Sequence, residues 1–159
     1  MKTFEYTLKQ YTNDDYEFVY ETKKVAYKNY VEINWGKWDE EQQKEMFVNF
    51  IDTYGKDIKI VMEKNKRIGF YHGENLENGG YEIGNICIIP ECQGRGIGTK
   101  ILNDILEEHK HQDIYLRYFK QNPVVKLYER LGFEMLEEMT FHFKMVKKAN
   151  IIQKEKMNN

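Results

Sequence analysis

The residues best suited to chemistry form a glycine-rich stretch near the middle of the chain, Gln93-Gly94-Arg95-Gly96-Ile97-Gly98. A short apolar run that ends at Pro90 precedes it and is typical of a strand buried on both faces. A helical pattern of apolar residues follows it, so the order is strand, loop, helix. The first N–H groups of a helix have no partner and carry positive partial charge, and glycines let a ligand approach them closely. The stretch therefore predicts a loop that binds a diphosphate, with the guanidinium of Arg95 as a further contact.

The spacing of the glycines indicates which phosphate ligand fits. A dinucleotide fingerprint needs a glycine or alanine where Thr99 stands, and a P-loop needs Gly-Lys-Ser/Thr where this chain has Gly98-Thr99-Lys100. The stretch instead resembles the Gln-x-x-Gly-x-Gly acetyl-CoA-binding motif of the GCN5-related N-acetyltransferase (GNAT) superfamily. A second stretch, Asn-Pro…Leu-Tyr-Glu-Arg-Leu-Gly-Phe from Asn122 to Phe133, resembles another signature of that superfamily.

The resemblance spans about Phe4 to Val146 and implies the GNAT-type acyl-CoA N-acyltransferase fold. This is a mixed α/β fold with a central sheet of about seven strands and four helices, in which strands 4 and 5 splay apart. It implies acetyl-CoA as cosubstrate. The length of the chain predicts a single domain, placed over residues 1–147, and the composition predicts a polar tail over 148–159. The residues that the resemblance assigns to acetyl-CoA are Ile86, Cys87, Ile88, Gln93, Gly94, Arg95, Gly96, Ile97, Gly98, Thr99 and Asn122.

Two side chains are candidates for proton transfer. By resemblance, Tyr128 lies beside the sulfur of CoA as general acid, although its place in an apolar stripe is equally that of a core tyrosine. Glu82 stands eleven residues before Gln93, the place of the base glutamate in the histone acetyltransferases of the superfamily. A water chain as the base, and a solvated surface role for Glu82, stay open. Cys92 belongs to the diphosphate loop and is not expected to carry an acyl group.

The acceptor site is expected around the first two helices and their loop. Tyr30, Trp35 and Trp38 lie there among carboxylates, a combination that could receive a cationic amine. The alternative is that Trp38 packs on the second helix and the carboxylates form an ordinary surface. His109 and His111 have no further ligands at useful spacing, so no metal site is predicted.

Composition and charge limit the classes of partner and the cellular setting that we expect for this chain. The formal net charge is −2 and the pI near 6.1, so the chain lacks the basic footprint of nucleic-acid binding. No apolar run approaches the length of a membrane span, and the amino terminus lacks the apolar core of a signal peptide. Cys87 and Cys92 suggest no disulfide framework, which favours a reduced, cytoplasmic setting. A homodimer stays open.

Periodicity and turn residues predict the elements directly. Strands are expected at about 4–8, 58–62, 68–74, 81–89, 114–119, 133–137 and 140–146, and helices at about 12–30, 39–54, 97–110 and 123–131. Trp35 to Trp38 is expected to be a loop. Asp39 and Asn122 are the expected N-caps of the second and fourth helices, and Gly132 the stop of the fourth. The buried faces of the first two helices are expected to include Phe18, Val19, Val25 and Ala26, and Met46, Phe47, Phe50, Ile51 and Tyr54.

The function that these features predict is direct transfer of an acetyl group from acetyl-CoA to a primary amine of a small molecule or a protein. The alternative is a non-catalytic acyl-CoA-binding module that senses CoA or regulates a partner. Glu82 and Tyr128 favour the enzyme, since a binding module would need neither. Acetylation of aminoacyl-tRNA is disfavoured by the acidic pI.

Overall fold

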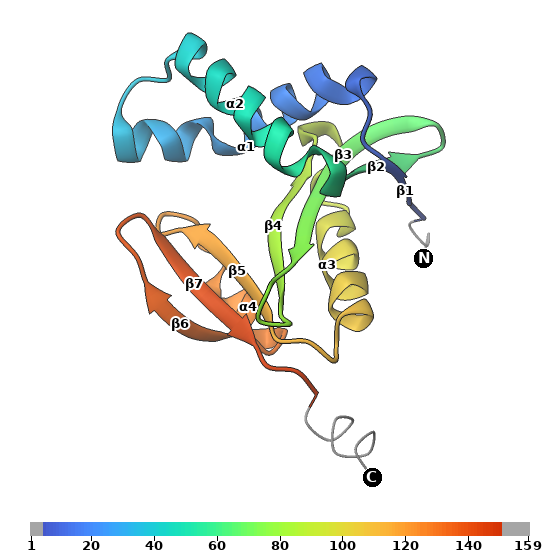
Figure 1. Cartoon of the computed structure of the whole chain (residues 1–159), viewed down its shortest axis with the longest axis vertical. Helices are drawn as coiled ribbons and strands as arrows, with labels where there is room; N and C mark the ends of the chain where they lie inside the picture. Colours follow the sequence, from blue (N-terminus) through green and yellow to red (C-terminus); the bar gives the residue numbers. More distant parts are fainter. Residues whose placement is uncertain (1–4, 151–159) are drawn as a thin grey trace. The chain divides into compact units, whose positions relative to one another are not determined.

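The computed structural model describes residues 5–150, which contain seven strands, four α-helices and three short 3-10 helices. Figure 1 shows their arrangement along the chain. The strands are β1 (Thr7–Gln10), β2 (Ile58–Glu63), β3 (Lys66–Asn75), β4 (Tyr81–Ile88), β5 (Ile114–Phe119), β6 (Glu134–Glu138) and β7 (His142–Lys147). The helices are α1 (Tyr16–Trp35), α2 (Glu40–Tyr54), α3 (Ile97–Glu108) and α4 (Val125–Arg130).

The strands hydrogen-bond in the order β1-β2-β3-β4-β5-β7-β6. β4 and β5 are parallel, whereas β1–β2, β2–β3, β5–β7 and β6–β7 are antiparallel. The predicted mixed sheet of about seven strands with four helices is therefore confirmed. The chain forms two compact units, one comprising the residues up to His72 with Asn85–Lys100, the other comprising Gly73–Gly84 with the residues from Ile101 on.

In the first unit, α1 and α2 pack on the strands through one apolar cluster. Full burial of one such side chain stabilises the fold by about 1.5–3 kcal/mol, so this cluster is the main contribution to the packing of the two helices on the strands. Its buried members come from α1, α2, β2, β3 and β4 and are Val19, Tyr20, Phe47, Ile58, Ile60, Phe70 and Cys87.

A buried carboxylate fixes the start of α1. Asp15 is only 2% exposed, and its Oδ2 accepts hydrogen bonds from Lys9 Nζ at 2.6 Å and from the Thr12 N–H at 2.9 Å. Its Oδ1 accepts from Arg67 Nη1 at 3.1 Å. Because two cations and a backbone donor surround it, this carboxylate is compensated where it is buried.

The second unit contains β5, β7 and β6 with the beginning of β4. The described register pairs Tyr81, Glu82 and Ile83 of β4 with Ile114, Tyr115 and Leu116 of β5, which are the first three residues of each strand. β6 lies at the edge of the sheet, all five of its residues are exposed, and its register with β7 shifts between Met135 and Glu137.

Several sequence predictions need correction in detail. The first strand is Thr7–Gln10, and Leu8 is 44% exposed rather than inward-facing; Phe4 lies outside the described residues. α1 continues to Trp35, so that tryptophan ends a helix rather than opening a loop. Val25 and Met46 are 59% and 56% exposed, because each points away from the cluster that the neighbouring positions bury.

The start of the tail is also more ordered than its polar composition suggests. Ala149 is buried, its N–H donates to Asp113 Oδ1 at 2.7 Å, and the Asn150 N–H donates to the Lys110 carbonyl at 2.9 Å. The remaining tail residues lie outside the described part of the chain.

Candidate active site

The predicted phosphate loop lies in the first unit and has the geometry that an anion needs. Gly94 and Gly96 have φ of +80° and +79°, a backbone conformation that L side chains rarely adopt. The first hydrogen bond of α3 runs from the Lys100 N–H to the Gly96 carbonyl at 3.0 Å. The N–H groups of Ile97, Gly98 and Thr99 come before this bond, so they have no acceptor within the helix. A Cβ at Gly94, Gly96 or Gly98 would meet no heavy atom within 4 Å. Open space in front of helical N–H donors fits a diphosphate.

Gln93 ties this loop to the end of β4. Its Nε2 donates to the Ile88 carbonyl at 2.9 Å, and the N–H of Ile89 donates to the Ile68 carbonyl of β3 at 2.9 Å. The side chain of Gln93 is thus bonded to the backbone of the chain itself. Its role in the structure is to hold the loop at the strand end from which the glycines depart.

Arg95 has a carboxylate partner that the sequence did not suggest. Its Nη1 and Nη2 donate to the two carboxylate oxygens of Glu63 at 3.1 and 2.8 Å. These hydrogen bonds lower the pKa of Glu63 below its ordinary value. A phosphate ligand at this arginine would share the guanidinium with Glu63 or displace that carboxylate.

The end of β4 is bonded to α1. Asn85 Nδ2 donates to the hydroxyl of Tyr27 at 2.9 Å, and the thiol of Cys87 lies 3.7 Å from the same oxygen. Burial raises the pKa of Cys87 to about 12, so its thiol stays protonated and is a poor nucleophile. Asn85 and Cys87 flank Ile86, so Tyr27 fixes the strand on both sides of that residue.

Tyr128 belongs to the second unit and lies in an aromatic cluster. The centroid of its ring is 5.5 Å from that of Tyr118 on β5 and 5.8 Å from that of Phe133. Burial, followed by the neighbouring Tyr118, raises the pKa of the Tyr128 hydroxyl. Within residues 5–150 this hydroxyl forms no hydrogen bond, so it has a proton that it can donate elsewhere.

Glu82 also belongs to the second unit and has a cationic neighbour. Its Oε1 lies 3.7 Å from Nη2 of Arg117, and the glutamate side chain is 21% exposed. Arg117 and Tyr118 are consecutive in β5, so they project from opposite faces of the sheet. Glu82, which contacts Arg117, and Tyr128, which contacts Tyr118, therefore lie on opposite faces of the sheet in this unit.

Asn122 does not cap α4 as predicted. The helix begins at Val125 with Val124 as its N-cap, and that cap has no side-chain hydrogen bond. The N–H of Asn122 instead donates to the Phe119 carbonyl at 2.9 Å, closing a turn after β5. This turn uses the residues that would have begun the helix. Gly132, with φ of +98°, ends the helical segment as predicted.

Comparison with known proteins identifies the family. The acetyltransferase (GNAT) domain model matches residues 55–135, just over half of the chain, including β2 to β5 and α4. The chain belongs to the GNAT acetyltransferase family. This confirms the family resemblance drawn from the glycine-rich loop and the Asn122–Phe133 signature.

Sequence relatives and solved structures agree with the family. An uncharacterized N-acetyltransferase of Methanocaldococcus jannaschii is 28% identical, over 90% of this chain and 67% of its own length. The spermine/spermidine N(1)-acetyltransferase of Bacillus subtilis is 30% identical over 45% of this chain, which spans half the length of that protein.

Two solved structures share the GNAT fold. The PaiA N-acetyltransferase of Thermoplasma acidophilum, in complex with coenzyme A, has a TM-score of 0.67 at 19% identity and covers 92% of this chain and all of its own. A histone acetyltransferase and related acetyltransferase from Corynebacterium glutamicum has a TM-score of 0.72 at 16% identity, over 92% of this chain and 98% of that one.

The carboxylate at the predicted acceptor region of this GNAT protein is already engaged. Glu40 accepts hydrogen bonds from Trp38 Nε1 at 2.7 Å, Lys24 Nζ at 2.8 Å and the Tyr20 hydroxyl at 2.9 Å. The bonds from Lys24, Tyr20 and Trp38, in that order, lower the pKa of Glu40 to about 2. Glu40 therefore joins the start of α2 to Tyr20 and Lys24 of α1, and it is not free to receive a substrate cation.

The other two predicted acceptor residues differ in exposure. Trp35 is 54% exposed at the end of α1. Tyr30 is half-buried one turn earlier, and its backbone carbonyl accepts a hydrogen bond from Asn34 Nδ2 at 2.9 Å.

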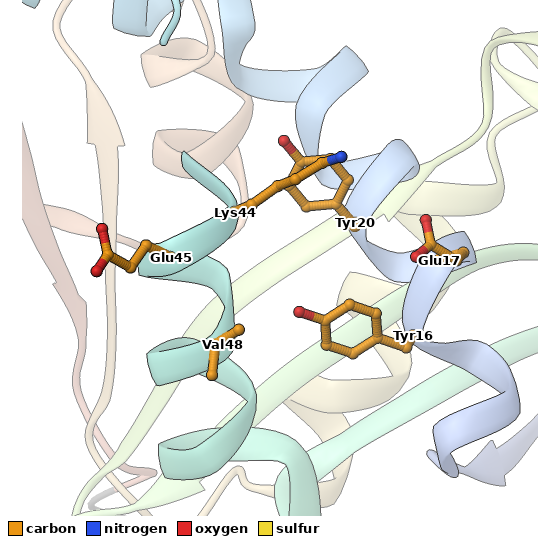
Figure 2. Close-up of a pocket in the computed structure, with 6 residues that line it drawn as sticks. All are labelled: Tyr16, Glu17, Tyr20, Lys44, Glu45 and Val48. Carbon is orange, nitrogen blue, oxygen red and sulfur yellow. The ribbon is translucent and has the colours of Figure 1, made fainter. Parts of the chain in front are cut away.

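A hollow of about 250 Å³ lies between α1 and α2, and Figure 2 shows the side chains that both helices contribute to it. It contains none of the residues predicted to bind an acceptor or a cofactor. Its lining consists of Tyr16, Glu17, Tyr20, Lys44, Glu45 and Val48. Residues 5–150 contain no cluster of three or more potential metal ligands, and none of their helices is long and apolar enough to cross a membrane.

Two residues of the site region escaped the sequence analysis. Glu63 and Asn85 meet Arg95 and Tyr27 across separations of 32 and 58 residues, for which short-range patterns give no signal.

Proposed function

We propose that this GNAT protein transfers an acetyl group from acetyl-CoA directly to a primary amine of a small molecule or a protein. The observation that carries the proposal is the loop in which Gly94 and Gly96, both at positive φ, lead into the N–H groups of α3 that precede its first helical hydrogen bond. The coenzyme A complex of a structural neighbour and the amine acetyltransferase among the sequence relatives support it.

In this proposal, the first unit holds the cofactor. The N–H groups of Ile97, Gly98 and Thr99 bind the diphosphate together with Arg95. The backbone of Cys87 and Ile88 pairs with the pantetheine arm, and the N–H near Ile86 donates to the thioester carbonyl as negative charge develops on its oxygen. Gln93 supports the loop. The proposal also assigns a contact with the cofactor arm to Asn122, a residue of the second unit.

The proposed chemistry needs three proton transfers. An alkylamine has a pKa of about 10.4, so it arrives protonated, and Glu82 removes that proton directly or through water. The amine nitrogen then attacks the carbonyl and the C–N bond forms. The nitrogen of the resulting intermediate loses its second proton to water, the C–S bond breaks, and Tyr128 protonates the departing thiolate. The raised pKa of Tyr128 keeps its hydroxyl protonated for this step.

The test is a screen of amine acceptors with acetyl-CoA, in which release of the CoA thiol is measured. Tyr128→Phe and Glu82→Gln are expected to reduce kcat by about 10²–10⁴-fold while CoA binding by calorimetry stays unchanged. Tyr118→Phe, in the same aromatic cluster, is the matched control for the tyrosine, and Glu134→Gln on exposed β6 for the glutamate. Full activity, or loss of CoA binding, in the Tyr128 variant would refute its role.

One observation favours the alternative of a non-catalytic acyl-CoA-binding module, namely that Arg117 lies beside the candidate base, Glu82. The same screen separates the two functions. A wild-type protein that binds CoA but releases no thiol with any amine would be such a module.

A further inference from the structure

Lys23 is a cation in the inward stripe of α1, and the described part of the chain gives it no carboxylate partner. It is half-buried, and its Nζ lies 4.4 Å from the ring centroid of Phe50 on α2. Among residues 5–150 it forms no ion pair. Its neighbour Lys24 differs in this respect, since its Nζ lies 2.8 Å from Oε2 of Glu40.

The surroundings of Lys23 leave its charge incompletely compensated. Burial lowers the pKa of this lysine below its ordinary value, and the nearby Cys87 thiol opposes that effect only in part. The face of the Phe50 ring attracts the ammonium group but supplies no anionic oxygen. Because a cation removed from water without a counter-charge costs free energy, an anion that reached Nζ would be stabilised there.

Lys23 lies on the helix face that covers the end of β4. One turn further along α1, Tyr27 bonds to Asn85 and Cys87, the two residues that flank Ile86. The proposed function assigns the thioester carbonyl to the N–H near Ile86, and the inference rests on that assignment. An amine that attacks the thioester there would bring its other substituents toward this face of α1.

We infer that Lys23 binds an anionic oxygen group of the acceptor, so that the preferred acceptors are primary amines that also carry a carboxylate or a phosphate. The ammonium group of Lys23 would then complete an ion pair only when the acceptor is bound. Simple diamines and polyamines lack this group and would leave Lys23 uncompensated. The acceptor class would thus differ from the one named for the Bacillus subtilis relative.

Matched pairs of acceptors test the inference. L-lysine is cadaverine with an added carboxylate, and phosphoethanolamine is ethanolamine with an added phosphate, so each pair isolates one anionic group. For the wild type we expect kcat/KM to favour the anionic member of at least one pair by about tenfold or more. The pair that shows the preference distinguishes carboxylate from phosphate.

Lys23→Met is the critical variant, because methionine keeps an unbranched side chain against the Phe50 ring and removes the charge. It is expected to abolish the preference for the anionic member and to leave the activity with cadaverine and ethanolamine, and the affinity for CoA, unchanged. Lys23→Arg should retain part of the preference. Lys24→Met is the matched control and should retain all of it.

Direct titration separates this inference from the proposed function. Calorimetry of the CoA-bound protein with L-lysine and with phosphoethanolamine should detect binding that Lys23→Met weakens by about tenfold, whether or not turnover occurs. Absence of thiol release with every amine would refute the transferase proposal. The calorimetric titration would still test whether Lys23 binds the anionic group. Four results would overturn the inference. The wild type could use both members of each pair equally, or its preference could survive Lys23→Met. Lys23→Met could lose affinity for CoA, or neither anionic probe could bind the wild type.

Discussion

Replacing Gly98 with alanine separates the folding of the phosphate loop from its binding of a ligand. Gly98 is the second residue of α3, its φ lies outside the left-handed region, and a Cβ there would meet no heavy atom within 4 Å. Alanine restricts the unfolded chain without straining such a position, so Gly98→Ala should stabilise the fold by about 0.4–1 kcal/mol. For a chain of this size that corresponds to a Tm higher by roughly 1–4 °C.

CoA binding should weaken in the same variant. In the proposed function a diphosphate binds the N–H groups at the start of α3, and the added methyl group would occupy open space beside them. Lengthening or losing one hydrogen bond to a charged phosphate costs about 1.5–3 kcal/mol, which raises Kd by about ten- to a hundredfold. A substitution that stabilises the protein and at the same time weakens ligand binding indicates that the glycine serves ligand access rather than folding.

Thermal melting and calorimetric titration with CoA measure the two effects on the same sample. Gly79→Ala is the control, because Gly79 also faces open space but has φ of +87°. This control should lose about 1–2 kcal/mol of stability and bind CoA like the wild type. A Gly98→Ala protein that binds CoA with unchanged Kd would refute the placement of the diphosphate.

Two further substitutions test the charges of the first unit. Asp15→Asn should lower the free energy of unfolding in urea by about 1–3 kcal/mol, because the buried carboxylate accepts from Lys9 and Arg67. Burial alone would raise the pKa of Asp15, but the hydrogen bonds from Lys9 and a backbone N–H and the charge of Arg67 lower it overall. The stabilisation from this carboxylate is therefore present above about pH 4, the unfolded-state pKa, and is lost as the pH falls through the lowered folded-state pKa. Asp15→Asn should not show this loss. Glu63→Gln should lower the Kd for CoA by up to about fivefold because it removes a carboxylate that competes with phosphate for Arg95, and Arg95→Met should raise the Kd. An unchanged Kd in both variants would exclude Arg95 from the binding site.

The parts of the site that depend on local signals were predictable from the sequence. The strand, glycine loop and helix around Gly94 and Gly96 form as expected, because positive φ and helix initiation are properties of adjacent residues. Asp39 caps α2 by accepting from the Gln42 N–H at 3.1 Å, and Gly132 ends the α4 segment. Each of these features depends on a span of only a few residues.

The parts that depend on tertiary contacts were not predictable. The Asn-Pro pair at Asn122 has the composition of a helix start, but a turn back to Phe119 takes up those residues and delays α4. The partner of Glu82, Arg117, lies on another strand, and its approach depends on the register between β4 and β5. The roles of Glu82 and Tyr128 stay predictions, since the geometry of each unit is compatible with them but does not test them.

The exposed strand β6 has a consequence for self-association. Within residues 5–150 no strand pairs with its outer edge, and in other sheets such an edge attracts a strand of a second molecule. Here Glu134 and Glu137 place negative charge on the strand, whereas Glu138 is paired with Lys120, and the irregular register near Met135 interrupts the straight ladder that strand addition needs. Two copies meeting edge to edge through β6 would bring these like charges together, so residues of the strand itself oppose aggregation through its edge.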